Sequence, residues 1–163
     1  MNLNYWIGVV SGSHIRIGVE GGFVQLNHGK KAPLQGFHAG DGLVIYSPRT
    51  SYPDGEPLQA FTAIGVVTTG DIYQVQMSPG FEPYRVDVQF MECREAPIKP
   101  LIDELSFITN KSHWGAAFRS GQDPGGGLRA DRRRHGLRPV DQRGRLNGLA
   151  AGNRPGWDRK KRC

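Results

Sequence analysis

Aromatic and polar side chains lie close together near the ends of the apolar runs of this 163-residue sequence. The aromatic residues of this group are Trp6, Phe23, Tyr46, Tyr84, Phe107 and Trp114. Polar or cationic groups occur within a few positions of several of them, at Ser11, His28, Lys30, Ser47, Arg85 and His113. An aromatic wall with a few convergent polar groups is what a pocket for a flat heteroaromatic ligand needs. Core packing is the alternative role for each of these aromatic residues.

The sequence contains no group of residues with the spacing of a catalytic or metal site. Gly29-Lys30 is similar to the end of a phosphate-binding loop, but residue 31 is Lys where the motif needs Ser or Thr. The five histidines lack the spacing of zinc ligands, and no G-x-S-x-G nucleophile motif is present. We therefore expect a protein that is not an enzyme and that needs no metal and no cofactor.

The clearest strand signal lies in the stretch from Ala39 to Pro48, which must position Tyr46 and Ser47. Gly40-Asp41-Gly42 predicts a tight turn, because glycine adopts positive φ without cost and Asp bonds nearby backbone. The next four residues, 43–46, are β-prone, and Ser47-Pro48 ends the run. A continuous apolar run of this length favours a strand that is covered on both faces.

Further elements are predicted on both sides of this strand. Four more strands are expected, at residues 5–10, 59–67, 72–77 and 84–90, with a bulge or close backbone approach at Gly65. Ser13 is expected to cap a short helix that Gly21-Gly22 ends, and residues 98–105 carry one apolar stripe of a second helix. Residues 23–34 are expected to form an ordered loop. Together these elements predict a mixed, barrel-like α+β domain of about five strands with short flanking helices.

The charge of the chain is divided unevenly along its length. Residues 1–118 hold 8 Lys and Arg against 11 Asp and Glu, a net charge of −3. Residues 119–163 hold 13 against 4, a net charge of +9, and carry nine glycines with no apolar period. Such a composition cannot bury enough apolar surface to offset its ordering entropy. We therefore expect an ordered domain over residues 1–118 and a disordered tail over residues 119–163. The basic charge of the tail does not indicate which partner the ordered domain binds.

Six stretches taken together resemble the EVE-domain family. They are N-Y-W-I-G-V-V-S near the start, G-G-F-V-Q-L-N-H-G-K-K-A-P-L, G-D-G-L-V-I-Y-S-P, P-L-Q-A-F-T-A-I-G, P-Y-R-V-D-V-Q-F and P-L-I-D-E-L-S-F-I-T-N-K-S-H-W-G. The resemblance covers roughly residues 4 to 118. It implies a PUA-like fold, a small curved β-barrel related to YTH and ASCH domains, in a family whose members are suspected readers of modified nucleobases.

The sequence departs from the family pattern after Trp114-Gly115. The resemblance implies a segment similar to Y-P-F-R-F-G at this point, followed by a closing amphipathic helix. Instead the chain continues with Ala116-Ala117-Phe118 and the Arg-rich and Gly-rich tail. One hypothesis is that the tail is an out-of-frame reading of that helix, which the coding DNA would decide. The alternative is a genuine Arg-rich extension that holds phosphates without sequence preference.

The function expected from the residues and the resemblance is non-enzymatic binding of a modified base in DNA or RNA. Trp6, Phe23, Tyr46 and Trp114 are the expected walls of the base pocket, and Ser11, Ser47 and Tyr84 its edge contacts. His28, Lys30 and Arg85 are expected to meet backbone phosphates. The alternatives are a small-molecule or protein-interaction module and an enzyme acting on a nucleotide or RNA.

Cytoplasm is the expected location. The chain has no apolar run of eighteen residues, and Met1-Asn2-Leu3-Asn4 lacks the basic start of a secretion signal.

Overall fold

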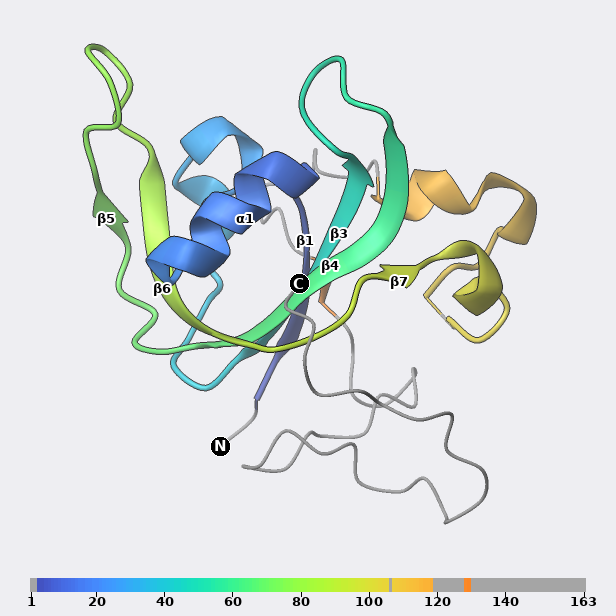
Figure 1. The fold of residues 1–163 in the computed structure, drawn as a ribbon. Helices are drawn as coiled ribbons and strands as arrows, with labels where there is room; N and C mark the ends of the chain where they lie inside the picture. Colours follow the sequence, from blue (N-terminus) through green and yellow to red (C-terminus); the bar gives the residue numbers. More distant parts are fainter. Residues whose placement is uncertain (1–2, 106, 119–127, 130–163) are drawn as a thin grey trace.

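Strand β3 (Gly42–Arg49) lies in the middle of the sheet in the computed structural model, which describes residues 3–105, 107–118 and 128–129. It pairs in parallel with β1 (Tyr5–Val9) and antiparallel with β4 (Pro57–Val67) (Figure 1). Leu43 and Ile45 belong to one apolar cluster and Tyr46 to a second one. The prediction of a strand covered on both faces is therefore confirmed.

The sheet contains eight strands in the order β2-β6-β4-β3-β1-β8, with β5 beside β6 and β7 beside β4. The other strands are β2 (Phe23–Val24), β5 (Tyr73–Gln74), β6 (Tyr84–Met91), β7 (Ala96–Pro97) and β8 (Leu128–Arg129). Among the described residues these pairings form an open path, and no pairing joins β2 to β8. The fold is therefore mixed α+β around an open mixed sheet, and the pairings do not close the expected barrel.

Helix α1 (Gly12–Gly21) crosses one face of the sheet and covers the larger apolar cluster (Figure 1). It begins after Ser11, and the predicted cap at Ser13 is wrong by two residues. Gly22 ends the helix in the left-handed conformation, with φ of 70°, and its N–H donates to the Gly18 carbonyl. The 3-10 turns η1 (Asn27–Gly29) and η2 (Ala32–Leu34) follow β2, where the sequence predicted a loop.

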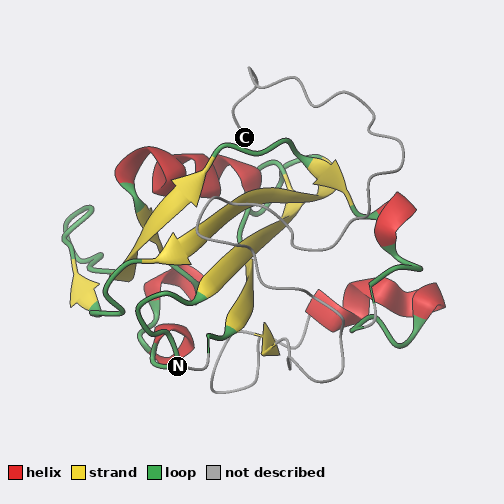
Figure 2. Cartoon of the chain, turned by 90° about the horizontal axis from the view of Figure 1, so that it is seen from below, coloured by secondary structure: helices red, strands yellow, loops and turns green. Residues whose placement is uncertain are grey.

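A smaller apolar cluster lies on the opposite face of the sheet, around Ile7, Tyr46, Ile98, Ile108 and Phe118. It is covered by the segment that contains η3 (Lys99–Leu101) and η4 (Lys111–Phe118). Figures 1 and 2 both show this segment beside the sheet, away from α1. The central strands therefore separate two cores of different size.

The regular helix predicted over residues 98–105 is wrong. The Leu101 N–H donates to the Ile98 carbonyl at 2.8 Å and the Glu104 N–H to the Leu101 carbonyl at 3.0 Å, which is the spacing of a 3-10 turn. Lys111 Nζ then donates to the Ile102 carbonyl at 2.6 Å. Ile98 is 0% exposed and the rest of the apolar stripe is partly buried, but only Lys99–Leu101 forms a helical element, and it is a 3-10 turn.

Two glycines show why the backbone can approach itself closely around β6. A Cβ on Gly65 would lie 2.6 Å from Val88 Cγ1, so the predicted close approach is confirmed. A Cβ on Gly29, whose φ is +78°, would lie 2.3 Å from Pro83 Cβ. Only glycine fits there without a shift, and this keeps η1 against the start of β6.

The remaining expectations concern the edges of the domain. Strand β5 is shorter than the predicted strand over residues 72–77. The expectations for the tail concern residues outside the described part of the chain, apart from β8, which pairs antiparallel with β1. Within the described residues, no helix is long and apolar enough to cross a membrane.

Candidate functional site

A cleft of about 560 Å³ lies on the face opposite α1, at the end of β1 and β3. We call it the aromatic cleft. It is lined by Val9, Tyr46, Pro48, Arg49, Pro57, Gln59, Ser112, His113, Trp114, Gly115, Ala116 and Phe118. Its volume lies within the range of about 300–1,000 Å³ that small-molecule sites span.

Three aromatic rings shape the wall of the aromatic cleft. Phe118 stacks on Tyr46, with 4.0 Å between ring centroids and 22° between planes. Trp114 meets Tyr46 edge to face, at 6.4 Å and 90°. Tyr46 comes from β3 and Trp114 from η4, so the wall depends on the packing of the smaller core. Arg49, Gln59 and His113 add a cation, an amide and an imidazole to this lining.

Burial raises the pKa of Tyr46 to about 12. The phenol is therefore neutral at physiological pH and keeps its proton for donation. A neutral hydroxyl on an aromatic wall suits the edge of a heteroaromatic ring, which offers hydrogen-bond acceptors.

The raised pKa of Tyr46 predicts a loss of stability at alkaline pH. The unfolded phenol has the ordinary pKa of 10.0 and the folded one a pKa of about 12, so the unfolded chain releases its proton first. Stability is then lost as pH rises from about 10 to about 12. We expect the fall in urea midpoint between about pH 8 and about pH 11 to be smaller in Tyr46→Phe than in the wild type. An equal fall in both proteins would contradict this. Burial and the hydrogen bond to Asp87 also raise the pKa of Tyr73 to about 12. Tyr73→Phe is therefore the comparison variant.

One arginine and two histidines gather around β6, on the side of the larger core. The Arg85 guanidinium lies 3.7 Å from the centroid of the Phe23 ring, and its Nε donates to Gln25 Oε1 at 3.2 Å. Burial, followed by the positive charges of Arg85 and His28, lowers the pKa of His14. We call His14, His28 and Arg85 the cation cluster. Arg85 supplies a positive charge to this region, and the two histidines supply ring nitrogens that can donate hydrogen bonds, so the cluster suits an anion.

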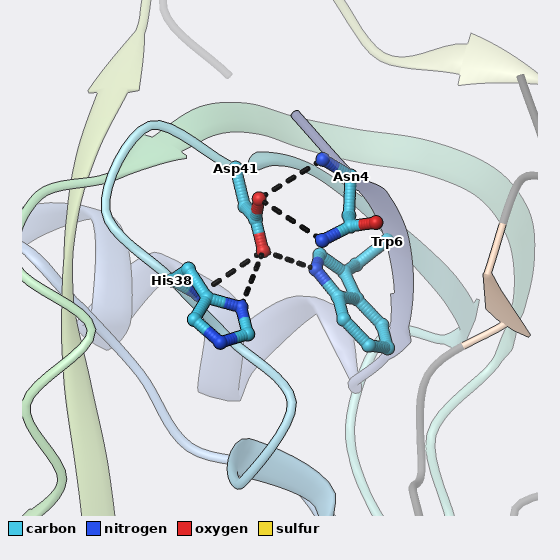
Figure 3. Close-up of polar contacts among 4 residues, drawn as sticks. All are labelled: Asn4, Trp6, His38 and Asp41. Carbon is cyan, nitrogen blue, oxygen red and sulfur yellow. Dashed lines mark hydrogen bonds and ion pairs between the residues drawn. The ribbon is translucent and has the colours of Figure 1, made fainter. Parts of the chain in front are cut away.

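A buried carboxylate holds the start of β1 against the turn before β3 (Figure 3). Asp41 is 1% exposed. Its Oδ1 accepts from the Asn4 N–H at 2.9 Å, and its Oδ2 from Trp6 Nε1 at 2.8 Å and the His38 N–H at 3.0 Å. The His38 ring also approaches Oδ2, with Nδ1 at 3.8 Å. Asp41 therefore organises the backbone that leads into both central strands.

The structure divides the site residues predicted from the sequence between different regions. Tyr46 and Trp114 line the aromatic cleft. Phe23, His28 and Arg85 lie at the cation cluster, and Tyr84 lies one residue before Arg85, with Lys31 Nζ 5.7 Å from its ring centroid. Lys30 is exposed directly after η1.

The other three predicted site residues lie outside the aromatic cleft, in the core or at the start of α1. Trp6 is 6% exposed and packs in the larger core, with its ring centroid 5.1 Å from that of Phe37. Ser11 is the residue before α1, and Ser47 is 0% exposed and bonds Thr62 at 2.7 Å between hydroxyl oxygens. None of these three lines the aromatic cleft.

Sequence reasoning missed Arg49 and Phe118 in the aromatic cleft, and Asp41 as a buried centre. Arg49 follows Pro48 and is the last residue of β3, so its side chain lies at the end of the strand, where the cleft is. Phe118 is the last apolar residue before the composition changes, and nothing nearby in the sequence marks it as a stacking partner of Tyr46. Within residues 3–105 and 107–118 the structure shows no group of three His, Cys, Asp or Glu that could hold a metal ion.

Comparison with known proteins shows similarity to a family and to several bacterial relatives. The EVE domain model matches residues 4–126. A UPF0310 protein of Mycolicibacterium vanbaalenii is 53% identical over 116 residues, which cover 71% of this chain and 80% of the relative. The UPF0310 protein YdcG of Bacillus subtilis is 50% identical over 121 residues, which cover 74% of this chain and 83% of the relative.

Proposed function

The chain belongs to the EVE-domain family, and we propose that it is a non-enzymatic nucleic-acid-binding domain that holds one modified base in the aromatic cleft. The observation that carries the proposal is the pairing of Tyr46 with Trp114 in a cleft that also contains Arg49 and His113. A flat ring can pack against the aromatic wall while polar groups meet its edge.

The base must leave its stack to enter such a site. A modification can be enclosed on all sides only when the base is extruded, which costs a few kcal/mol. Packing on aromatic side chains returns about 1–3 kcal/mol per base, so stacking alone roughly balances extrusion. The edge contacts then decide which base is retained. The neutral Tyr46 hydroxyl and the Arg49 guanidinium are the groups we assign to that discrimination.

Charge supports a specific rather than a general attraction. Residues 1–118 carry a net charge of −3, so the domain has little nonspecific affinity for phosphate backbones. The basic balance of residues 119–163 can attract any nucleic acid, and this attraction weakens as salt rises. Discrimination between modified and plain strands should therefore persist at salt concentrations that suppress overall binding.

The experiment is an affinity measurement with the full chain. Matched DNA and RNA oligonucleotides that differ only in one methylated or hydroxymethylated cytosine, or one methylated adenine, are compared by fluorescence anisotropy at low and raised salt. We expect at least one modified strand to bind about tenfold more tightly than its plain partner, equivalent to about 1.4 kcal/mol. Equal binding at both salt concentrations would defeat the proposal and favour the interaction module. Mass spectrometry of the recovered strand would reveal turnover, and with it the enzyme alternative.

A further inference from the structure

Tyr52 is an exposed aromatic residue at the tip of the loop between β3 and β4. Its exposed fraction is 72%, the highest among the large hydrophobic residues described as exposed. Its ring meets the His28 ring edge to face, with centroids 5.1 Å apart. Tyr52 therefore extends from one loop to another and leaves much of its ring available to solvent.

The loop that carries Tyr52 is held in place by its own hydrogen bonds. The Thr50 N–H donates to the Glu56 carbonyl at 2.9 Å, and the Gly55 N–H to the Ser51 carbonyl at 3.1 Å. Arg49 Nη1 also donates to the Gly55 carbonyl at 2.8 Å. An aromatic ring on an ordered loop loses little conformational freedom when a flat ligand packs on it.

The cation cluster lies next to Tyr52, because His28 belongs to both groups. Arg85 is oriented by its contacts with Phe23 and Gln25, and among the described residues it has no carboxylate in ion-pair range. Its Nη groups therefore remain able to donate to an anion. The η1 turn that contains His28 packs against the start of β6, since a Cβ on Gly29 would lie 2.3 Å from Pro83 Cβ and 3.6 Å from Tyr84 N, and this places His28 near Arg85. His14 lies in the first turn of α1, and burial followed by the charge of Arg85 lowers its pKa, so its imidazole is a neutral hydrogen-bonding group in the same region.

The loop from Thr50 to Glu56 also reaches the aromatic cleft. Arg49 lines the cleft at the base of the loop, while Tyr52 meets His28 at its tip. In Figure 1 this loop rises between α1 on one side and η4 on the other. The cleft and the cation cluster are thus joined by one short, ordered connection.

We propose that Tyr52, with His14, His28 and Arg85, forms a second nucleotide subsite that holds the phosphate and the base next to the one in the aromatic cleft. Arg85 and the two histidines bind the phosphate, and the neighbouring base stacks on Tyr52. This inference rests on the proposed function. It makes the ligand a strand of at least two nucleotides, and a free nucleoside occupies only half of the surface.

The test compares ligands of increasing length with the full chain. The modified nucleoside monophosphate and a trinucleotide that carries the same modified base are titrated into the wild type and into Tyr52→Ala. We expect the trinucleotide to bind more tightly, and Tyr52→Ala to weaken it about fivefold or more while leaving the monophosphate unchanged. Phe81→Ala is the matched control, because Phe81 is also exposed, at 38%, on the turn between β5 and β6. It should leave both affinities unchanged.

A second variant tests the phosphate contact. Arg85→Gln should weaken the trinucleotide and lower the slope of log affinity against log salt by about 0.7, the value for one phosphate on a single strand. Unfolding curves confirm that the variant still folds, since Arg85 also packs on Phe23. If both ligands bind equally and Tyr52→Ala changes neither, the second subsite is excluded while the proposed function stands. If neither ligand binds, both are excluded.

Discussion

Replacing Asp41 by Ala is expected to lower the free energy of unfolding by about 3–5 kcal/mol. The carboxylate accepts hydrogen bonds from the Asn4 N–H, Trp6 Nε1 and the His38 N–H, and it is 1% exposed. A hydrogen bond to a charged group contributes about 1.5–3 kcal/mol, and the buried Trp6 indole N–H is also left without a partner, although losses at one site do not add fully. Because these donors lie at the start of β1 and in the turn before β3, the loss affects both central strands.

Two variants separate this loss from a general effect of removing a carboxylate. Asp54→Ala removes an exposed carboxylate and should change stability by less than about 0.5 kcal/mol. Asp41→Asn keeps one acceptor oxygen and should fall between the two. Urea denaturation followed by circular dichroism measures all three. If Asp41→Ala and Asp54→Ala lost the same stability, the hydrogen bonds of Asp41 would not hold the strands together.

The Asp41 network explains why sequence patterns could not place Trp6 correctly. A tryptophan on a predicted strand is compatible with a core as well as with a pocket wall. The decision depends on Asp41, which is 35 residues away and supplies the acceptor for the indole N–H. A glycine-bounded Asp reads as a turn residue, so its long-range role has no local signal. The turn itself, and the strand after it, were predicted because they depend on neighbouring residues.

The side of β3 on which Ser47 lies could have been predicted from the sequence. Successive residues of a strand point to opposite faces of a sheet, so Tyr46 and Ser47 cannot both line one side of β3. The structure places Tyr46 toward the aromatic cleft and buries Ser47 against Thr62. Strict use of this alternation would have grouped Tyr46 with Pro48, which does line the cleft.

The cleft itself depends on pairings that no periodicity reveals. Trp114 and Phe118 reach Tyr46 only because the segment after β7 turns back over the face opposite α1. The apolar spacing of residues 98–105 indicated that this segment packs on the core, as Ile98, Ile102 and Leu105 do, but it did not indicate a 3-10 turn. Packing follows from apolar composition, whereas helix type follows from backbone hydrogen bonds. The ring contacts of Tyr46 could therefore not be predicted from neighbouring residues. Its position near the end of a central strand could be predicted in that way.

Trp114→Ala is expected to weaken binding of the preferred modified strand by about tenfold or more. Aromatic packing contributes about 1–3 kcal/mol per base, and the indole forms part of the cleft wall. The indole is half-buried and keeps no hydrogen bond to the core among the described residues, so the variant should remain folded. Anisotropy titrations with the modified strand and its plain partner measure the change.

The comparison of the two strands gives this prediction its specificity. If Trp114 encloses the modified base, Trp114→Ala lowers the affinity for the modified strand more than that for the plain one, and the ratio of the two falls. Trp114→Phe keeps a ring at the same place and should retain most of the ratio. Val9→Ala removes an aliphatic group from the same lining and should change the ratio little, because it takes no aromatic surface away. A Trp114→Ala protein that folds and still discriminates as the wild type does would place the base elsewhere on the domain.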